Sequence, residues 1–173
     1  MVMKRSAAMM LAMTGLSACA TPTDAPSSAV AVPLLGSNGQ SIGSVRIWQT
    51  SGAVGLRVEG NGLPVGRKGL HVHAVGRCDA PGFTTAGPHW NPAQRRHGLA
   101  SPAGPHAGDL PNVPIAANGS LRETLVLPGA SLASLADTDG SALVLHAGED
   151  DNVTDPSGNS GDRIACAVLT TGR

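Results

Sequence analysis

The residues best suited to chemistry in this chain are its six histidines. His71 and His73 flank Val72 in an apolar run, and a spacing of two in a β-strand places both imidazoles on one face. Such a pair alone is a weak metal signal, because histidines are commonly solvated or capping residues. Of the remaining four, three lie in one long loop and the fourth, His146, lies where a strand enters a second long loop, which strengthens the signal.

A Gly- and Pro-rich stretch without apolar periodicity covers residues 78–112 and carries three histidines and a carboxylate: His89, His97, His106 and Asp109. Three histidines with one carboxylate suit a closed, tetrahedral zinc site. A bound metal would also hold so long a loop in one shape. His146 ends a further apolar run, where the chain enters a second long loop, residues 148–162. Nitrogen ligands around an open position would suit copper.

The elements that must position these residues have the period-two pattern of β-strands. Apolar residues alternate with polar ones or form short β-rich runs at residues 29–35, 44–47, 54–59, 69–74, 121–127, 142–146 and 163–169. Turn sequences separate several of the runs, and residues 130–136 could form one short helical turn. We therefore expect an all-β, antiparallel sandwich or barrel with two long loops.

Composition excludes several classes of protein. Tyrosine is absent, with one phenylalanine and two tryptophans, which argues against a helical bundle and against a stacking surface for nucleic acid. The formal net charge is zero and no basic run occurs, so no nucleic-acid partner is expected. Two cysteines in the body of the chain, Cys78 and Cys166, would form one disulfide in an oxidising compartment. Two reduced, buried thiols are the alternative.

The first twenty residues are typical of an export signal. Lys4 and Arg5 precede an apolar segment of about ten residues, too short to span a bilayer. Residues 16–19 (LSAC) favour a bacterial lipobox, which would leave Cys19 lipidated, although residues 18–20 also fit ordinary signal-peptidase cleavage. We expect a signal over residues 1–19, a flexible tether over 20–29 and one domain over 30–173. The expected location is the periplasm, with the protein anchored to a membrane by lipid.

Six segments together resemble the copper–zinc superoxide dismutases. They are residues 69–73 (GLHVH), 87–92 (GPHWNP), His97, 106–109 (HAGD), His146 and 161–166 (GDRIAC). The resemblance runs from about residue 30 to 170, in the order and spacing of the family. It implies an eight-stranded, antiparallel Greek-key β-barrel with two long loops that form the metal site.

The resemblance also implies a role for each matching residue. Copper would be bound by His71, His73, His89 and His146. Zinc would be bound by His89, which bridges the two metals, with His97, His106 and Asp109. Asp150 would accept hydrogen bonds from one histidine of each site, Cys78 and Cys166 would form the disulfide, and Arg163 would guide an anion to copper. Asp150 and Arg163 could otherwise be solvated surface charges.

The implied activity is oxidoreductase catalysis, in which superoxide disproportionates to O₂ and H₂O₂ as copper cycles between Cu(II) and Cu(I). His89, supported by zinc, would carry the proton to peroxide. A non-catalytic copper- and zinc-binding protein on the same barrel is the main alternative. A zinc hydrolase fits poorly, because the zinc ligand set leaves no open position. The expected partner is superoxide alone, and the chain could be a monomer or a homodimer.

Overall fold

The computed structural model describes residues 25–26 and 28–171. Its elements are short strands with almost no helix, as the period-two pattern predicts. They are β1 (Val30–Gly36), β2 (Ser41–Thr50), β3 (Ala53–Gly60), β4 (Gly66–Lys68), β5 (Leu70–His73), the 3-10 helix η1 (Thr84–Ala86), β6 (Val113–Ile115), β7 (Leu121–Pro128), α1 (Leu132–Leu135), β8 (Gly140–His146) and β9 (Arg163–Thr171).

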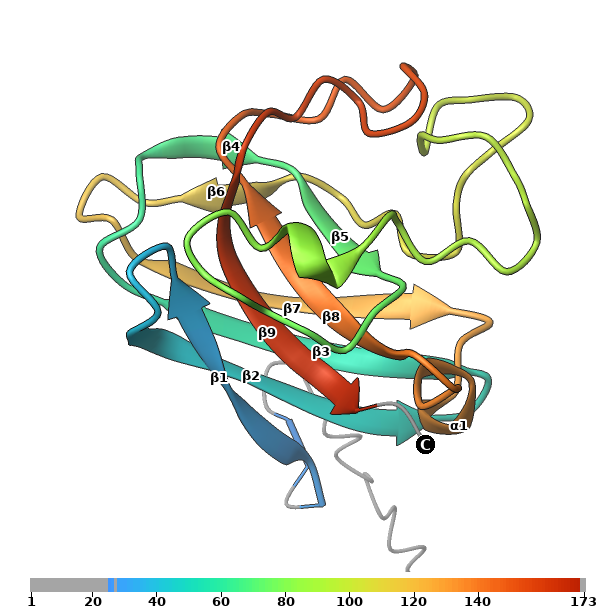
Figure 1. Cartoon of the computed structure of the whole chain (residues 1–173), viewed down its shortest axis with the longest axis horizontal. Helices are drawn as coiled ribbons and strands as arrows, with labels where there is room; N and C mark the ends of the chain where they lie inside the picture. Colours follow the sequence, from blue (N-terminus) through green and yellow to red (C-terminus); the bar gives the residue numbers. More distant parts are fainter. Residues whose placement is uncertain (1–24, 27, 172–173) are drawn as a thin grey trace, which may run out of the picture.

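Seven strands form one antiparallel, curled sheet in the order β5-β8-β9-β1-β2-β3-β7, and β4 pairs with β6 in a second, two-stranded sheet. Strands distant in sequence therefore lie side by side, as β1 does with β9 and β3 with β7. In Figure 1, β5, β8 and β9 lie in front of β2, β3 and β7. Such long connections between antiparallel neighbours are typical of Greek-key folds.

An aliphatic core fills the space between these two layers. Along β3, Val54, Leu56 and Val58 are fully buried in it, and Leu143 of β8 and Ala167 of β9 join them from the opposite layer. Branched aliphatic side chains pack well on a pleated surface, so the scarcity of aromatic residues does not prevent a dense core.

The structure confirms the expected all-β, antiparallel fold. The described residues contain nine strand segments, of which β4 and β5 form one run of chain that is interrupted at Gly69, so the segments correspond to eight runs. The Gly69 N–H donates to the Gly148 carbonyl of the second loop, and the Gly69 carbonyl accepts from the N–H of His146, the last residue of β8. Sequence analysis missed β4 and β6, which are three residues long; Pro114 lies in the middle of β6.

The two long loops are present where the sequence predicts them, between β5 and β6 and between β8 and β9. In Figure 1 they extend beyond the ends of the strands. The expected helical turn also forms, as α1, with Ser131 as its N-cap. The export signal, its lipobox and most of the tether lie outside the described residues. Within the described part of the chain, no helix has the length and apolar character needed to cross a bilayer.

Candidate metal centre

Strand β5 and the first long loop bring the histidines together. β5 pairs with β8 on one side, and isolated bridges on its other side join His71 to Asp109 and His73 to His89. The loop thus continues the sheet beside His71 and His73. Val72 packs into the core while its two neighbours point toward the loop, so the alternation of the strand positions both imidazoles.

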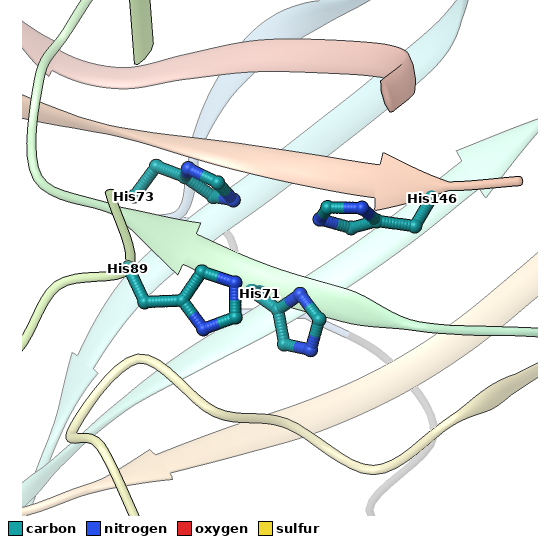
Figure 2. A group of neighbouring side chains, drawn as sticks. All are labelled: His71, His73, His89 and His146. Carbon is teal, nitrogen blue, oxygen red and sulfur yellow. The ribbon is translucent and has the colours of Figure 1, made fainter. Parts of the chain in front are cut away.

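Four histidine side chains converge on one point, as Figure 2 shows: His71, His73, His89 and His146. One nitrogen of each ring lies within 4.8 Å of the others, and all four residues are buried. The nitrogens His71 Nδ1, His73 Nε2, His89 Nε2 and His146 Nε2 are buried with no hydrogen-bond partner among the described residues. Unpaired buried polar atoms are costly and rare, so four that converge fit a site for a metal ion.

Hydrogen bonds on the far side of three of these rings fix which nitrogen is free. His73 Nδ1 lies 2.8 Å from the Gly87 carbonyl, and His146 Nδ1 lies 3.0 Å from the Gly161 carbonyl. A carbonyl only accepts, so both Nδ1 atoms carry the proton and both Nε2 atoms present a lone pair. His71 Nε2 likewise donates to Asp150 over 2.6 Å, which leaves Nδ1 free. Such outer partners orient the histidines of metal sites.

Burial keeps these rings neutral. It lowers the pKa of His71 to about 4, of His73 to about 2 and of His146 to about 3, because a charged imidazolium loses its hydration in the interior. Neutral imidazole is the form that binds a metal. These three rings are therefore in the ligand form at neutral pH.

A second group shares one member with the first. It comprises His89, His97, His106 and Asp109, whose ligand atoms also lie within 4.8 Å of one another. Asp109 Oδ1 is 3.0 Å from His89 Nδ1, 3.1 Å from His97 Nδ1 and 3.5 Å from His106 Nδ1. Three nitrogens and one carboxylate form the donor set of a closed zinc site.

Asp109 is ionised within this group. Burial would raise the pKa of its carboxyl, but hydrogen bonds from His89 and from the Gly98 N–H outweigh that effect and lower the pKa to about 2. Its second oxygen accepts from the Gly98 and His106 N–H groups. The carboxylate is therefore held with Oδ1 directed at the three rings.

His89 belongs to both groups through its two different nitrogens. Nε2 faces the first group and Nδ1 faces the second, where it lies 3.4 Å from His106 Nδ1. The structure thus brings together all seven predicted ligand residues, in the two sets that the sequence resemblance implies.

Asp150 connects the two groups from behind. Its Oδ2 lies 2.6 Å from His71 Nε2 and its Oδ1 lies 3.1 Å from His97 Nε2. Burial would raise the pKa of this carboxyl, but the bond from His71 is the largest of several that hold the pKa well below its usual range. Asp150 is 3% exposed, so the alternative of a solvated loop acid is wrong.

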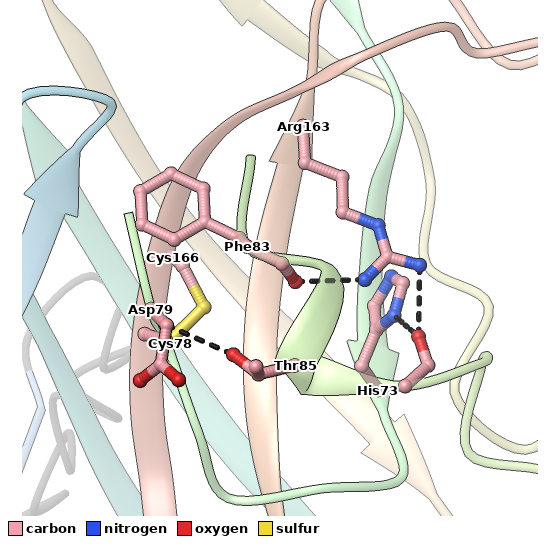
Figure 3. Close-up of a disulfide and its surroundings, with 8 residues drawn as sticks. His73, Cys78, Asp79, Phe83, Thr85, Arg163 and Cys166 are labelled. Carbon is pink, nitrogen blue, oxygen red and sulfur yellow. Dashed lines mark hydrogen bonds between the residues drawn. A yellow bond between two sulfur atoms is a disulfide. The ribbon is translucent and has the colours of Figure 1, made fainter. Parts of the chain in front are cut away.

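Arg163 lines a cavity of about 450 Å³ beside the first group. His73, His89 and His146 line the same cavity. Figure 3 shows the guanidinium donating to the Phe83 carbonyl over 2.8 Å, and a second bond of 2.8 Å joins it to Gly87. Two fixed bonds hold this cation at the cavity wall, so it is not a freely solvated charge.

The disulfide Cys78–Cys166 ties the first loop to β9, three residues after Arg163, with Cα atoms 5.7 Å apart. This confirms the expected pairing. Phe83 and Ala86 of the loop pack against the same part of β8 and β9. The disulfide therefore anchors the segment whose carbonyls hold Arg163 (Figure 3).

Sequence analysis missed two positioning residues. Asp155 Oδ1 accepts from the His97 N–H over 2.6 Å, which ties the second loop to the first. The buried Lys68 donates from Nζ to the Ala147 carbonyl, directly after His146. Asp155 lies in a polar loop directly before a proline, and Lys68 lies just outside the expected strand at residues 69–74. Neither residue belongs to a motif that could have identified it.

The comparisons with known proteins agree with this geometry. The family model described as copper/zinc superoxide dismutase matches residues 41–169. Superoxide dismutase [Cu-Zn] 1 of Aquifex aeolicus is 39% identical over 142 residues, which cover 79% of this chain and 84% of that protein.

Two solved structures share the fold. The crystal structure of a SOD-like protein from Bacillus subtilis is 37% identical, with a TM-score of 0.77, over 80% of this chain and 97% of that one. The Cu/Zn superoxide dismutase from Brucella abortus is 29% identical, with a TM-score of 0.69, over 82% of this chain and 99% of that one. With the paired histidine groups, the disulfide and the matched sequence, this chain belongs to the copper/zinc superoxide dismutase family.

Proposed function

We propose that this chain is a superoxide dismutase that binds copper through His71, His73, His89 and His146, and zinc through His89, His97, His106 and Asp109. One observation carries the proposal: four buried, unpaired ring nitrogens converge beside a cavity whose wall holds a fixed guanidinium. When bound, copper supplies one-electron redox chemistry, whereas zinc has none and shapes the loop.

The residues of the chain bind and orient the substrate. Superoxide is a small anion, and the Arg163 guanidinium attracts it into the cavity. Partial burial lowers the pKa of Arg163, but an arginine still stays charged at neutral pH. Its bonds to the Phe83 and Gly87 carbonyls keep the charge in one place, so little reorganisation is needed when the anion arrives.

His89 is the residue suited to carry a proton. Its Nδ1 stays directed at Asp109 over 3.0 Å, while Nε2 borders the cavity side. A proton held at Nε2 can pass to a reduced anion next to it, with the ring fixed by the carboxylate. His73 and His146 direct Nδ1 at backbone carbonyls, whereas Nδ1 of His89 faces the carboxylate of Asp109.

The test is metal content measured together with superoxide-dependent turnover. We expect about one copper and one zinc per chain in the wild type, and loss of both copper and turnover in His71→Ala. Arg163→Ala should retain both metals but slow turnover roughly tenfold or more at low salt, because the local field that steers the anion is removed. Arg163→Lys, which keeps the charge, should retain more of the rate and its salt dependence.

A non-catalytic metal-binding protein is the second candidate, favoured by the likeness to a protein described only as SOD-like. It predicts bound copper and zinc with no turnover above that of free metal. Full superoxide turnover by His71→Ala would refute the proposal that this chain is a dismutase with copper bound by His71.

The proposal extends to location. Residues 16–19 support lipid attachment at Cys19 after export, which would place the domain at a membrane of an oxidising compartment, consistent with the disulfide. Mass spectrometry of the mature N-terminus distinguishes the two cleavage sites. A lipid-modified Cys19 supports the lipobox, and an unmodified N-terminus after residue 20 contradicts it.

A further inference from the structure

A cluster of arginines lies on the outer face of β2, β3 and β7, far from the metal centre in the order of strands. Arg46, Arg57 and Arg122 line a pocket of about 250 Å³ with Glu59 and Ala25, which we call the arginine pocket. Alternate residues of β2 and β3, such as Val45 and Val58, fill the core, so these polar side chains point outward.

The strand register places these charges next to one another. Arg46 lies directly opposite Arg57 across β2 and β3, and Glu59 lies opposite Arg122 across β3 and β7. Like charges directly opposite each other destabilise a sheet. Among the described residues, Glu59 is the one carboxylate that lines the pocket, and it faces Arg57 at 3.1 Å and Arg122 at 3.6 Å. The described side chains of the pocket, three cations and one anion, carry a net charge of about +2.

The three arginines differ in how they are held. Arg57 is largely buried, and its guanidinium donates to Glu59 Oε1 and to Thr124 Oγ1. The exposed Arg46 guanidinium has no hydrogen bond or ion pair to any residue that the structure describes. Arg122 is exposed and meets only the shared Glu59 carboxylate within that same part of the chain. Arg46 and Arg122 therefore flank a braced cation and can both turn toward an anion.

This pocket stands out from the charge of the protein as a whole. Removal of an export signal that contains Lys4 and Arg5 would leave ten basic and twelve acidic residues. A positive pocket on a net acidic domain indicates a local anionic ligand instead of general attraction to polyanions.

The pocket also lies where the chain would approach a membrane. Ala25 lines it, and Cys19 precedes Ala25 by six residues, a span of at most about 20 Å even when fully extended. We propose that the arginine pocket binds the phosphate groups of anionic phospholipids in the membrane that carries the Cys19 lipid, an inference that rests on the proposed lipid attachment. Guanidinium groups pair with phosphate oxygens through two parallel hydrogen bonds.

Docking through this face would orient the enzyme. The two strands that carry metal ligands, β5 and β8, lie at the opposite end of the strand order from β2, β3 and β7. With the arginine pocket against the headgroups, the cavity beside Arg163 stays open to the aqueous compartment. A single lipid chain binds a membrane only weakly, so a second, electrostatic contact would stabilise the anchored state.

The experiment separates this surface from the lipid and from catalysis. Cys19→Ser chains, which keep an ordinary cleavage site but cannot be lipidated, are mixed at low salt with phosphatidylcholine vesicles with or without phosphatidylglycerol. Arg46→Gln/Arg122→Gln is compared with Arg67→Gln/Arg77→Gln, a control that removes two exposed arginines elsewhere. The Cys19→Ser protein with an unsubstituted arginine pocket should bind the vesicles that contain phosphatidylglycerol and not those of phosphatidylcholine alone. Its double variant should bind about 25-fold more weakly, from roughly fivefold for each arginine, and should retain full turnover.

Failure of this surface is distinguishable from failure of the proposed function, because turnover is measured on the same samples. No binding to anionic vesicles, or an equal loss of binding in the control variant, would overturn the docking surface even if superoxide turnover is normal. Release by inorganic phosphate but not by chloride at equal ionic strength would support recognition of phosphate groups by the arginine pocket. Binding of inorganic phosphate to the protein without any binding to anionic vesicles would identify a soluble phosphate as the ligand, and would overturn the headgroup assignment.

Discussion

Replacing Asp150 with asparagine tests how the two histidine groups are oriented. The carboxylate accepts from His71 Nε2 over 2.6 Å and from His97 Nε2 over 3.1 Å, one member of each group. An asparagine amide offers one oxygen and one NH₂, so it can accept from only one of the two rings. The other ring must leave a buried N–H unpaired or move that proton to the nitrogen that faces the metal.

The structure sets the size of the effect. A buried donor without a partner costs about 1–3 kcal/mol, which corresponds to roughly 5- to 150-fold in affinity. Loss of outer partners in metal sites typically weakens metal binding by about 10–100-fold, which agrees. Asp150→Asn should therefore weaken one of the two metals by that factor and leave the other near its wild-type affinity. Asp150→Ala, with no acceptor, should weaken both.

The assay is competition with a chromophoric chelator, run separately for Cu(II) and Zn(II). Asp151→Asn is the matched control, since it removes the same charge from the next residue, an exposed acid that accepts from the Val153 and Thr154 N–H groups. Wild-type affinity for both metals in Asp150→Asn, or a loss no greater than in Asp151→Asn, would refute this account of the site.

Three further outcomes follow from the structure. In the metal-free protein, three histidines whose pKa burial lowers to about 4, 2 and 3 stay neutral when folded but protonate near pH 6.5 when unfolded, so the stability they contribute is present above that pH and lost on acidification; they are His71, His73 and His146. The free energy of unfolding, measured with urea, should therefore fall from pH 6 to pH 5 by roughly 1 kcal/mol per histidine, and a rise would contradict this. Cys78→Ser should destabilise the domain by about 4–5 kcal/mol, for a loop of 88 residues, and unchanged thermal unfolding would contradict that entropic estimate. Asp162→Asn removes an exposed negative charge next to Arg163 and should speed superoxide turnover about two- to threefold at low salt only. An equal effect at high salt would show that this charge does not act on the electrostatic attraction of superoxide.

Much of this fold can be predicted from the sequence, because the long strands leave either an alternating pattern or a short β-rich run. The run 121–127 corresponds to β7 (Leu121–Pro128), and 163–169 to β9 (Arg163–Thr171). The β4–β6 pair could not be found in the same way. Three residues are less than two periods of alternation, and Pro114 in β6 counts against a strand in any scheme based on sequence.

The candidate site was also predictable only in part. The spacing of His71 and His73 alone predicts that both side chains lie on one face of a strand, and the ligands in the loops follow from the family resemblance. The carbonyls of Gly87 and Gly161, which select the ring tautomers, carry no side-chain signal. Contacts that span the fold, such as Lys68 to Ala147, depend on the path of the loops and not on any local pattern.

The Gly87 carbonyl accepts two hydrogen bonds, one from His73 Nδ1 and one from the Arg163 guanidinium, each over 2.8 Å. Gly87 has φ 74°, and a side chain there would press within 2.9 Å of Val75. Movement of this peptide would therefore shift the His73 ring and the Arg163 guanidinium together. A substitution at position 87 could not change one without the other, so the two side chains are coupled through a single backbone oxygen.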